Sequence, residues 1–76
     1  MNIEEMKKKL QALDVPDYMY TLTLKLPSDQ FYIGKISDKN EWEVYYGERG
    51  RKNDRKVFDD ESKACEYFIE WIVKYK

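Results

Sequence analysis

Apolar residues recur along this chain with two different periods, and each period predicts a different kind of element. In the first segment they lie three or four residues apart, which predicts one face of a helix, formed by Ile3, Met6, Leu10 and Leu13. Asn2 is placed to cap this helix, and Glu5 stands three residues later, as in a capping box. We expect the helix to end within residues 14–17, because Pro16 disfavours helical backbone in the residue before it.

From residue 18 onward the period changes to two, which predicts strands. Residues 18–26 place alternate apolar side chains on one face, namely Tyr20, Leu22, Leu24 and Leu26. Turn-forming residues separate this first strand from a second at 30–36 and a third at 41–46. We expect these strands to pair in an antiparallel sheet.

The third strand begins the stretch that most needs explanation, WEVYYGERGRKNDRKVF at residues 42–58. Strand alternation places Glu43 and Tyr45 on the open face of the sheet and turns the heavier set toward the helices: Trp42, Val44 and Tyr46. We expect residues 47–54 to project as a mobile loop. A short fourth strand at about 55–58 then pairs back across it.

The last segment returns to helical spacing and predicts a helix that begins at Asp59 or Asp60. Its apolar face is broad and comprises Ala64, Cys65, Phe68, Trp71, Ile72 and Tyr75. So wide a face suits a helix lying across a sheet, with Trp71 packed between the two. We therefore expect one domain, residues 1–76, in the order α-β-β-β-(β)-α. This is an α+β fold in which an N-terminal helix, a three- to four-stranded antiparallel sheet and a C-terminal helix pack together.

Composition narrows the class of partner. The 76 residues include 14 basic and 15 acidic side chains, and the net charge of −1 argues against nucleic acid as the main partner. No apolar run approaches the roughly 18 residues of a membrane span, and the start lacks the pattern of a signal peptide. The single cysteine excludes an internal disulfide. We expect a cytoplasmic protein with no membrane partner, as a monomer or a weak dimer joined through strand 18–26.

Few side chains in this sequence are suited to catalysis or to metal binding. The chain has no histidine, which is the commonest general base and zinc ligand. Cys65 lies on the apolar helix face with no imidazole to activate it, which favours a core thiol over a nucleophile. The cluster Asp59-Asp60-Glu61 favours capping of a helix N-terminus over a metal site. We therefore expect a non-enzymatic protein with no catalytic residues, no metal and no cofactor.

Residues 48–56 hold a dense positive charge, for which we weigh two interpretations. Two carboxylates, Glu48 and Asp54, stand against five cations, a local net charge of +3: Arg49, Arg51, Lys52, Arg55 and Lys56. One interpretation is a small nucleic-acid- or phosphate-binding module. The other, which we favour, is a solvated hairpin tip whose cations discourage pairing at the sheet edge.

The order helix, three strands, helix is also that of double-stranded-RNA-binding domains. Those domains begin their second helix with lysines that grip phosphates. This chain has Asp59-Asp60-Glu61 at that position, followed by Lys63 alone. Three carboxylates at the expected phosphate clamp argue against this mode of binding.

A second resemblance covers most of the chain. The segment WEVYYGERGRKNDRKVFDDESKACEYFIEWI resembles the C-terminal half of small immunity proteins of bacterial polymorphic-toxin systems. The similarity rests on a tryptophan, a Val-Tyr-Tyr, a Glu-Arg-Gly, a basic turn, a phenylalanine and an acidic helix start before Ala-Cys. The opening MNIEEMKKKLQALDVP is also similar to their first helix, whereas TLTLKLPSDQFYIGKI is more strand-like than the Gly-rich segment expected there.

This resemblance implies a protein that neutralises a cognate toxin by direct one-to-one binding and carries out no chemistry. Gly50 suits a turn position with positive φ. Glu48 and Arg49 either tie that turn to the sheet or contact the partner. The residues expected to bind the partner are Tyr45, Tyr46, Glu48, Arg49 and Arg51. Two alternatives stay open: the nucleic-acid- or phosphate-binding module, and an inhibitor of another nucleic-acid machine.

Overall fold

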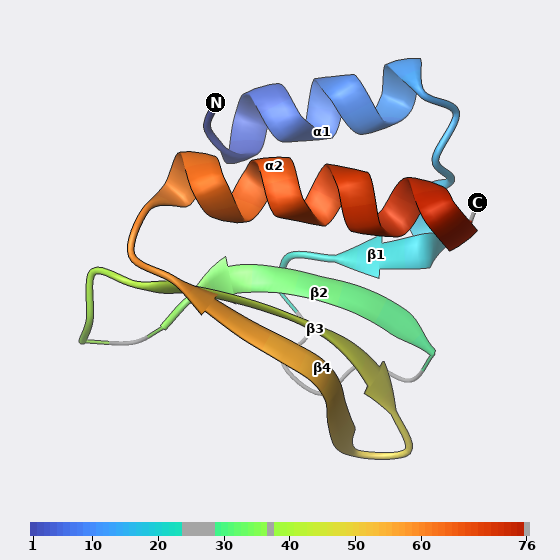
Figure 1. Cartoon of the computed structure of the whole chain (residues 1–76). Coiled ribbons are helices and arrows are strands. Elements are labelled where there is room, and N and C mark those ends of the chain that lie inside the picture. Colours follow the sequence, from blue (N-terminus) through green and yellow to red (C-terminus); the bar gives the residue numbers. More distant parts are fainter. Residues whose placement is uncertain (24–28, 37, 76) are drawn as a thin grey trace.

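The structure, a computed structural model, describes residues 1–23, 29–36 and 38–75. Two helices lie on the same side of a four-stranded sheet, as Figure 1 shows. This arrangement confirms the expected α+β fold. The elements in chain order are α1 (Ile3–Ala12), the 3-10 helix η1 (Asp17–Met19), β1 (Tyr20–Thr21), β2 (Gln30–Lys35), β3 (Trp42–Glu48), β4 (Arg51–Phe58), α2 (Glu61–Ile72) and the 3-10 helix η2 (Val73–Tyr75).

Side-chain caps fix where both helices begin. Asn2 and Glu5 form the expected capping box at the start of α1, each side chain accepting the other residue's backbone N–H. Asp60 caps α2, and its carboxylate accepts the N–H of Ser62 at 3.3 Å. Glu61 then joins the two helix starts, because its Oε2 accepts the N–H of Ile3 at 2.9 Å. A carboxylate between two helix N-termini is favourable to both helix dipoles.

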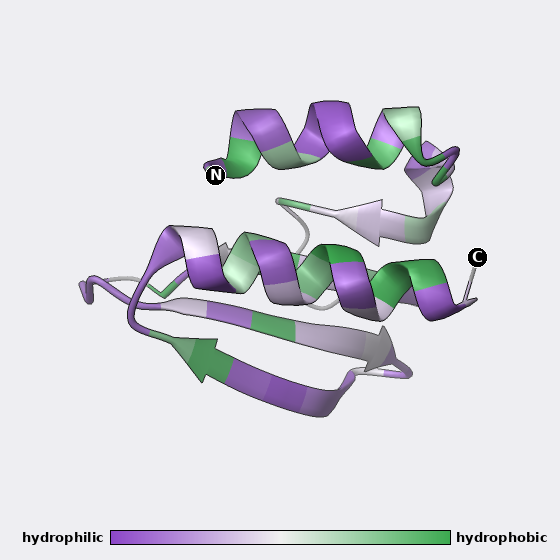
Figure 2. Cartoon of the chain, turned by 45° about the horizontal axis from the view of Figure 1, so that its top comes forward, coloured by the Kyte–Doolittle hydropathy of each residue, from purple (hydrophilic) through white to green (hydrophobic). Residues whose placement is uncertain are grey.

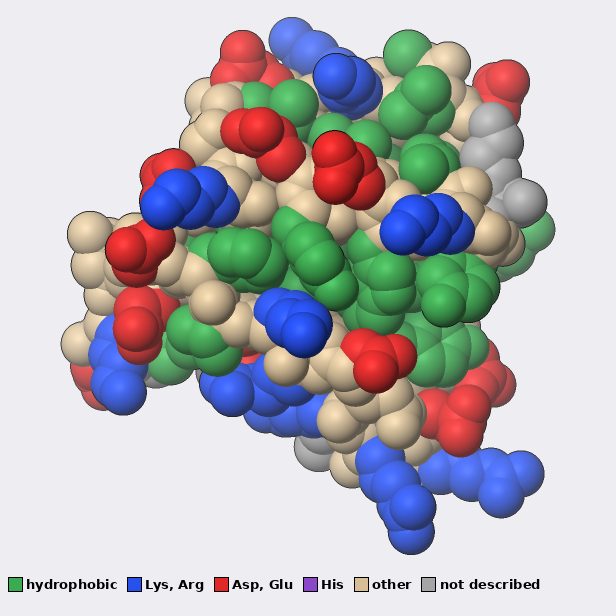
Figure 3. Space-filling view, viewed as in Figure 1, with side chains coloured by type: hydrophobic (Ala, Val, Ile, Leu, Met, Phe, Trp, Pro, Cys, Tyr) green, Lys and Arg blue, Asp and Glu red, His purple; other side chains and the backbone are tan. Residues whose placement is uncertain are grey.

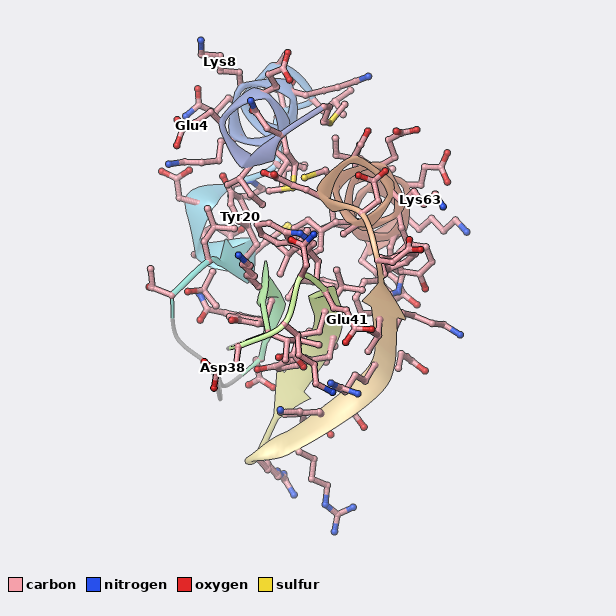
Figure 4. All side chains as sticks on the ribbon, turned by 90° about the vertical axis from the view of Figure 1, so that its left-hand side faces the viewer. Glu4, Lys8, Tyr20, Asp38, Glu41 and Lys63 are labelled. Atoms are coloured by element: carbon pink, nitrogen blue, oxygen red, sulfur yellow. The ribbon has the colours of Figure 1, made fainter. Side chains whose placement is uncertain are left out.

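The core lies between the helices and the sheet. Met6 and Leu10 enter it from α1, and Phe31, Ile33 and Val44 enter it from the sheet. The contribution of α2 is larger and comprises Ala64, Cys65, Phe68, Ile69 and Ile72. Figure 2 shows the corresponding split of each helix into an apolar side and a polar side. In Figure 4 the charged side chains of Glu4, Lys8 and Lys63 point away from this core, and Tyr20 lies between the helices and the sheet.

The apolar face expected for α2 needs two corrections. Ile69, which that face omitted, is buried, whereas Tyr75 is 64% exposed. Trp71 does pack on the sheet, with its ring centroid 4.7 Å from that of Phe31, but it is only partly buried. The helix lies with the Trp71–Tyr75 side at the border of the core rather than over its middle.

The sheet order is β1-β2-β3-β4, and β2, β3 and β4 are antiparallel neighbours. The expected first strand, 18–26, is wrong in length and direction. The described part is a strand only at Tyr20–Thr21, preceded by the turn of η1, and it runs parallel to β2. Residues 24–28 of that prediction lie outside the described residues. Alternation in a sequence sets which side chains share a face, but it carries no information about the direction of the neighbouring strand.

The hairpin between β3 and β4 is much tighter than the expected loop 47–54. Glu48 pairs with Arg51, so only Arg49 and Gly50 form the turn. Their φ angles are +49° and +79°, the positive pair that a two-residue type I′ hairpin turn requires. The fourth strand therefore begins at Arg51 rather than near residue 55.

This geometry predicts opposite effects of two substitutions in the turn. No other side chain lies within 4 Å of a Cβ added at Gly50, so Gly50→Ala costs only conformational energy, about 1–2 kcal/mol. Arg49→Asn should raise stability by a few tenths of a kcal/mol, because asparagine tolerates positive φ better than arginine. Urea unfolding of both variants measures the two changes. Equal stability of Gly50→Ala and wild type would contradict the turn.

On the far face of the sheet, the side chains of Tyr45 and Glu43 are buried rather than open to solvent. Val44 lies in the core, and Tyr45 and Glu43 point the other way, as alternation predicts. However, Tyr45 is only 1% exposed, because its ring stacks on that of Tyr32 at 4.8 Å with 29° between the planes. The Tyr32 ring also extends over Gly34, where an added Cβ would lie 2.6 Å from the ring carbon Cζ.

Gly34→Ala should therefore destabilise the fold by about 1–3 kcal/mol, the usual cost of forcing a methyl group into a packed site. The cost should shrink in a Tyr32→Ala background, where the obstructing ring is gone. A double-mutant cycle by chemical denaturation measures this coupling. Additive effects of the two substitutions would show that the ring and the glycine are not in contact.

Candidate partner-binding site

The cations of residues 49–56 do not form one patch. Lys52 and Arg55 lie on the far face, where both bind Glu43 through N···O distances of 3.8 and 2.8 Å. Lys52 also lies over the Tyr45 ring, 5.1 Å from its centroid. Lys56 pairs with Val44 and so lies on the helix side of the sheet.

The chain is irregular where β4 passes Tyr45. The register shifts between Val44 and Tyr46, and Asp54 has a φ of +56°, which marks a β-bulge. Charged side chains and a bulge are the features by which natural sheets prevent their edges from pairing with other chains. Because β4 is an edge strand, its charges suit the protection of that edge. Figure 2 shows how hydrophilic most of β4 is before its apolar end.

The acidic start of α2 is occupied by structural contacts. Asp60 caps the helix, Glu61 accepts from Ile3, and Asp59 pairs with Lys63 at 3.6 Å. Across residues 1–23, 29–36 and 38–75, no group of three carboxylates or thiols is arranged to hold a metal ion. Each carboxylate of the cluster thus has its own protein partner.

Cys65 is a residue of α2, and its thiol is fully buried in the core. Burial raises its pKa from 9.0 to about 11, and the Glu61 carboxylate adds to this effect. A thiol with so high a pKa forms little thiolate at neutral pH. These properties agree with a core thiol.

Two consequences of this pKa can be measured. Because the folded-state pKa lies above the unfolded value, the thiol's contribution to stability is fully present below pH 9 and is lost as pH rises toward 11. Unfolding free energy should thus fall more steeply over this range for wild type than for Cys65→Ala. Below pH 9, iodoacetamide should react about a hundredfold more slowly with the folded protein than with the urea-unfolded chain. Equal rates would contradict the burial of Cys65.

A hollow of about 580 Å³ lies at the end of the sheet where β2 begins and β3 ends. The C-terminal end of α2 reaches the same end of the sheet, together with η1 and the start of β4 (Figure 1). Five aromatic rings line the hollow: Tyr18, Phe31, Tyr46, Trp71 and Tyr75. Met19 and Asn53 also line it, with three carboxylates, Asp29, Glu48 and Asp54.

Contacts between the aromatic rings that line the hollow hold these rings in place. The Phe31 ring lies 4.9 Å from Tyr46, 4.7 Å from Trp71 and 5.6 Å from Tyr75 between centroids. Gln30 connects η1 to the sheet, since its Nε2 donates to the backbone carbonyl of Tyr18 at 3.1 Å. The hollow is therefore built on the same contacts that hold α2 against the sheet.

The three carboxylates come from irregular or terminal positions of the backbone. Asp29 has a φ of +58° and donates its N–H to the Gly47 carbonyl at 2.8 Å. Asp54 is the bulge residue of β4, and Glu48 is the last residue of β3. The pKa of Tyr46 is raised, mainly by burial and then by the charges of Asp29 and Glu48. The carboxylates thus create a negative potential at the Tyr46 hydroxyl.

The rings continue away from the hollow as a band along the line where α2 meets the sheet. This aromatic band consists of Phe58, Tyr67, Trp71 and Tyr75. Tyr67 lies 5.3 Å from Phe58 and 5.9 Å from Trp71 between centroids. Figure 3 shows apolar side chains gathered between α2 and the sheet, with acidic side chains beside one end and basic side chains at the tip below.

The structure distributes the five predicted contact residues over three places. Tyr46 and Glu48 line the hollow, and Arg49 and Arg51 are exposed at the hairpin tip. Tyr45 is buried on the opposite face of the sheet. The sequence alone did not identify the other residues that line the hollow as part of a binding site. The signal that could have found part of it is the i, i+4 spacing of Tyr67, Trp71 and Tyr75, which sets three rings in a row along the consecutive helices α2 and η2.

Comparisons with protein-family models, with curated proteins and with solved structures find no match for this chain. Of the helices in the described parts of the chain, none has the length and apolar character to cross a membrane.

Proposed function

We propose that this protein is a non-enzymatic inhibitory binding protein, which neutralises a cognate bacterial toxin by direct one-to-one binding. The resemblance of its sequence to small immunity proteins of polymorphic-toxin systems motivates the proposal. The observation that carries it is the placement of exposed apolar side chains. Among the described residues three large apolar side chains are exposed, and two of them, Tyr18 at 76% and Tyr75 at 64%, border the same hollow.

Exposed aromatic rings around a concave site are the usual anchors of a protein interface. Tryptophan, tyrosine and arginine dominate the binding energy of such interfaces, and charged groups around them set the rate and specificity of association. The aromatic band and the hollow together offer Trp71 and Tyr75 as anchors, with Glu48 beside them. The tight packing beneath them through Phe31 supports a preformed surface, which lowers the entropy cost of binding.

The nucleic-acid- or phosphate-binding alternative has less support. It needs the cations of residues 49–56 to act together, yet Lys52 and Arg55 bind Glu43 on the far face. On the helix side, the carboxylates of the hollow repel phosphate. A gel-shift series with RNA and DNA at low salt should therefore show no retardation, and salt-sensitive binding there would favour this alternative.

The proposal predicts that Tyr75→Ala weakens toxin binding while stability falls by only about 1 kcal/mol, because this ring contacts Phe31 but is 64% exposed. Removing an exposed anchor ring typically weakens binding by about 2 kcal/mol or more, which corresponds to a roughly thirtyfold higher Kd. The measurement is isothermal titration calorimetry with the toxin domain that the proposal expects to be encoded beside this gene, with melting curves to confirm folding.

Two variants control this experiment. Val57→Ala removes an exposed apolar side chain from the far face and should leave Kd unchanged. Arg51→Ala tests the hairpin tip, and a larger loss there than for Tyr75→Ala would place the contact on the tip instead of the hollow. If no complex forms when the two proteins are co-expressed, the proposed function is wrong.

A further inference from the structure

We infer that the hollow is a binding site for a cationic side chain, and that an arginine guanidinium from the protein partner is its occupant. The assignment of the occupant to a protein partner rests on the proposed function. The preference for a guanidinium rests on the hollow itself, which combines aromatic walls with carboxylates. Its volume of about 580 Å³ lies within the range of about 300–1,000 Å³ that ligand sites occupy.

The aromatic walls favour a cation over a neutral group. Aromatic rings carry negative charge on their faces and attract a cation placed within about 6 Å of the ring centre. Trp71, the strongest ring type for this interaction, lines the hollow beside Tyr18 and Tyr75. Arginine stacks on such rings better than lysine does, because its guanidinium is planar and less strongly hydrated.

The carboxylates strengthen the same preference. Asp29, Glu48 and Asp54 line the hollow, and no lysine or arginine lines it with them. None of the ion pairs between described side chains involves these three carboxylates. A guanidinium has five N–H donors in a fixed plane, which can bind carboxylates while its face lies on a ring. An anionic occupant would be repelled, and a neutral one would gain nothing from the negative charge of the carboxylates.

The surroundings of the hollow favour a protein side chain over a free small molecule. Tyr18 and Tyr75 stand exposed at its border, and the aromatic band extends from it along α2. A free cation would cover little of this apolar surface, whereas a protein partner would bury the band and insert one side chain into the hollow.

The test uses the full chain without any toxin. ¹⁵N-labelled protein is titrated with N-acetyl-arginine methylamide, and in parallel with the citrulline analogue, a neutral compound of nearly the same shape. We expect saturable shifts at the Trp71 indole N–H and at the amides of Tyr46 and Glu48 with the arginine probe. The citrulline probe should bind at least tenfold more weakly, and the lysine analogue should bind with intermediate strength.

Matched variants separate charge from shape. Glu48→Gln combined with Asp54→Asn removes two charges and keeps the side-chain sizes, and asparagine tolerates the positive φ at residue 54. We expect this double variant to bind the arginine probe at least fivefold more weakly. Glu4→Gln, an exposed carboxylate on the outer side of α1, should bind it as wild type does.

Several outcomes would overturn the inference: equal binding of the arginine and citrulline probes, unchanged binding by the double variant, or no saturable shift at the hollow up to millimolar concentrations. Failure of the proposed function is distinguishable from these. If the arginine probe binds but no toxin complex forms, the hollow remains a cation site and the proposed function is wrong. If the toxin binds while the probe shifts nothing at the hollow, only the inference about arginine is wrong.

Discussion

The rest of the structure depends on the contacts of the Phe31 ring. Phe31 lies in β2, is 5% exposed, and touches rings from β3, from α2 and from η2. Its backbone also pairs with Tyr20 of β1, whose ring contacts Phe68 of α2. One side chain thus holds the sheet to the second helix and forms part of the hollow. A substitution of Phe31 would consequently change both the stability of the fold and the shape of the hollow.

The hollow also depends on irregular backbone. Among the described residues, five other than glycine have positive φ, and four of these are aspartates: Asp14, Asp29, Asp38 and Asp54. Aspartate tolerates this conformation because its short side chain can bond to nearby backbone. At Asp29 and Asp54, the residue type that suits the turn or bulge also supplies the negative charge of the hollow. At these two positions, a single aspartate therefore both suits the positive φ of the backbone and contributes negative charge to the hollow.

Sequence patterns predicted the elements whose causes are local. The capping box at Asn2, the cap at Asp60 and the strands near 30–36 and 41–46 follow from nearby residues alone, and the structure confirms them, with the strand ends shifted by one or two residues. The parallel direction of β1 could not be predicted, because alternation does not encode strand direction. The hollow was also out of reach, since its lining joins residues from 18 to 75 that only the packing of α2 brings together.

The basic segment shows why a charge sum over a strand misleads. Side chains of a strand point alternately to opposite faces, and a bulge changes the alternation where it occurs. The net charge of +3 near the hairpin therefore does not belong to any one surface. Lys52 and Arg55 neutralise Glu43 on the far face, while Glu48 and Asp54, which the sum treats as mere dilution, both line the hollow. A segment that is basic in sequence thus supplies two of the three carboxylates of the candidate binding site. The sign of a surface on a sheet has to be counted face by face.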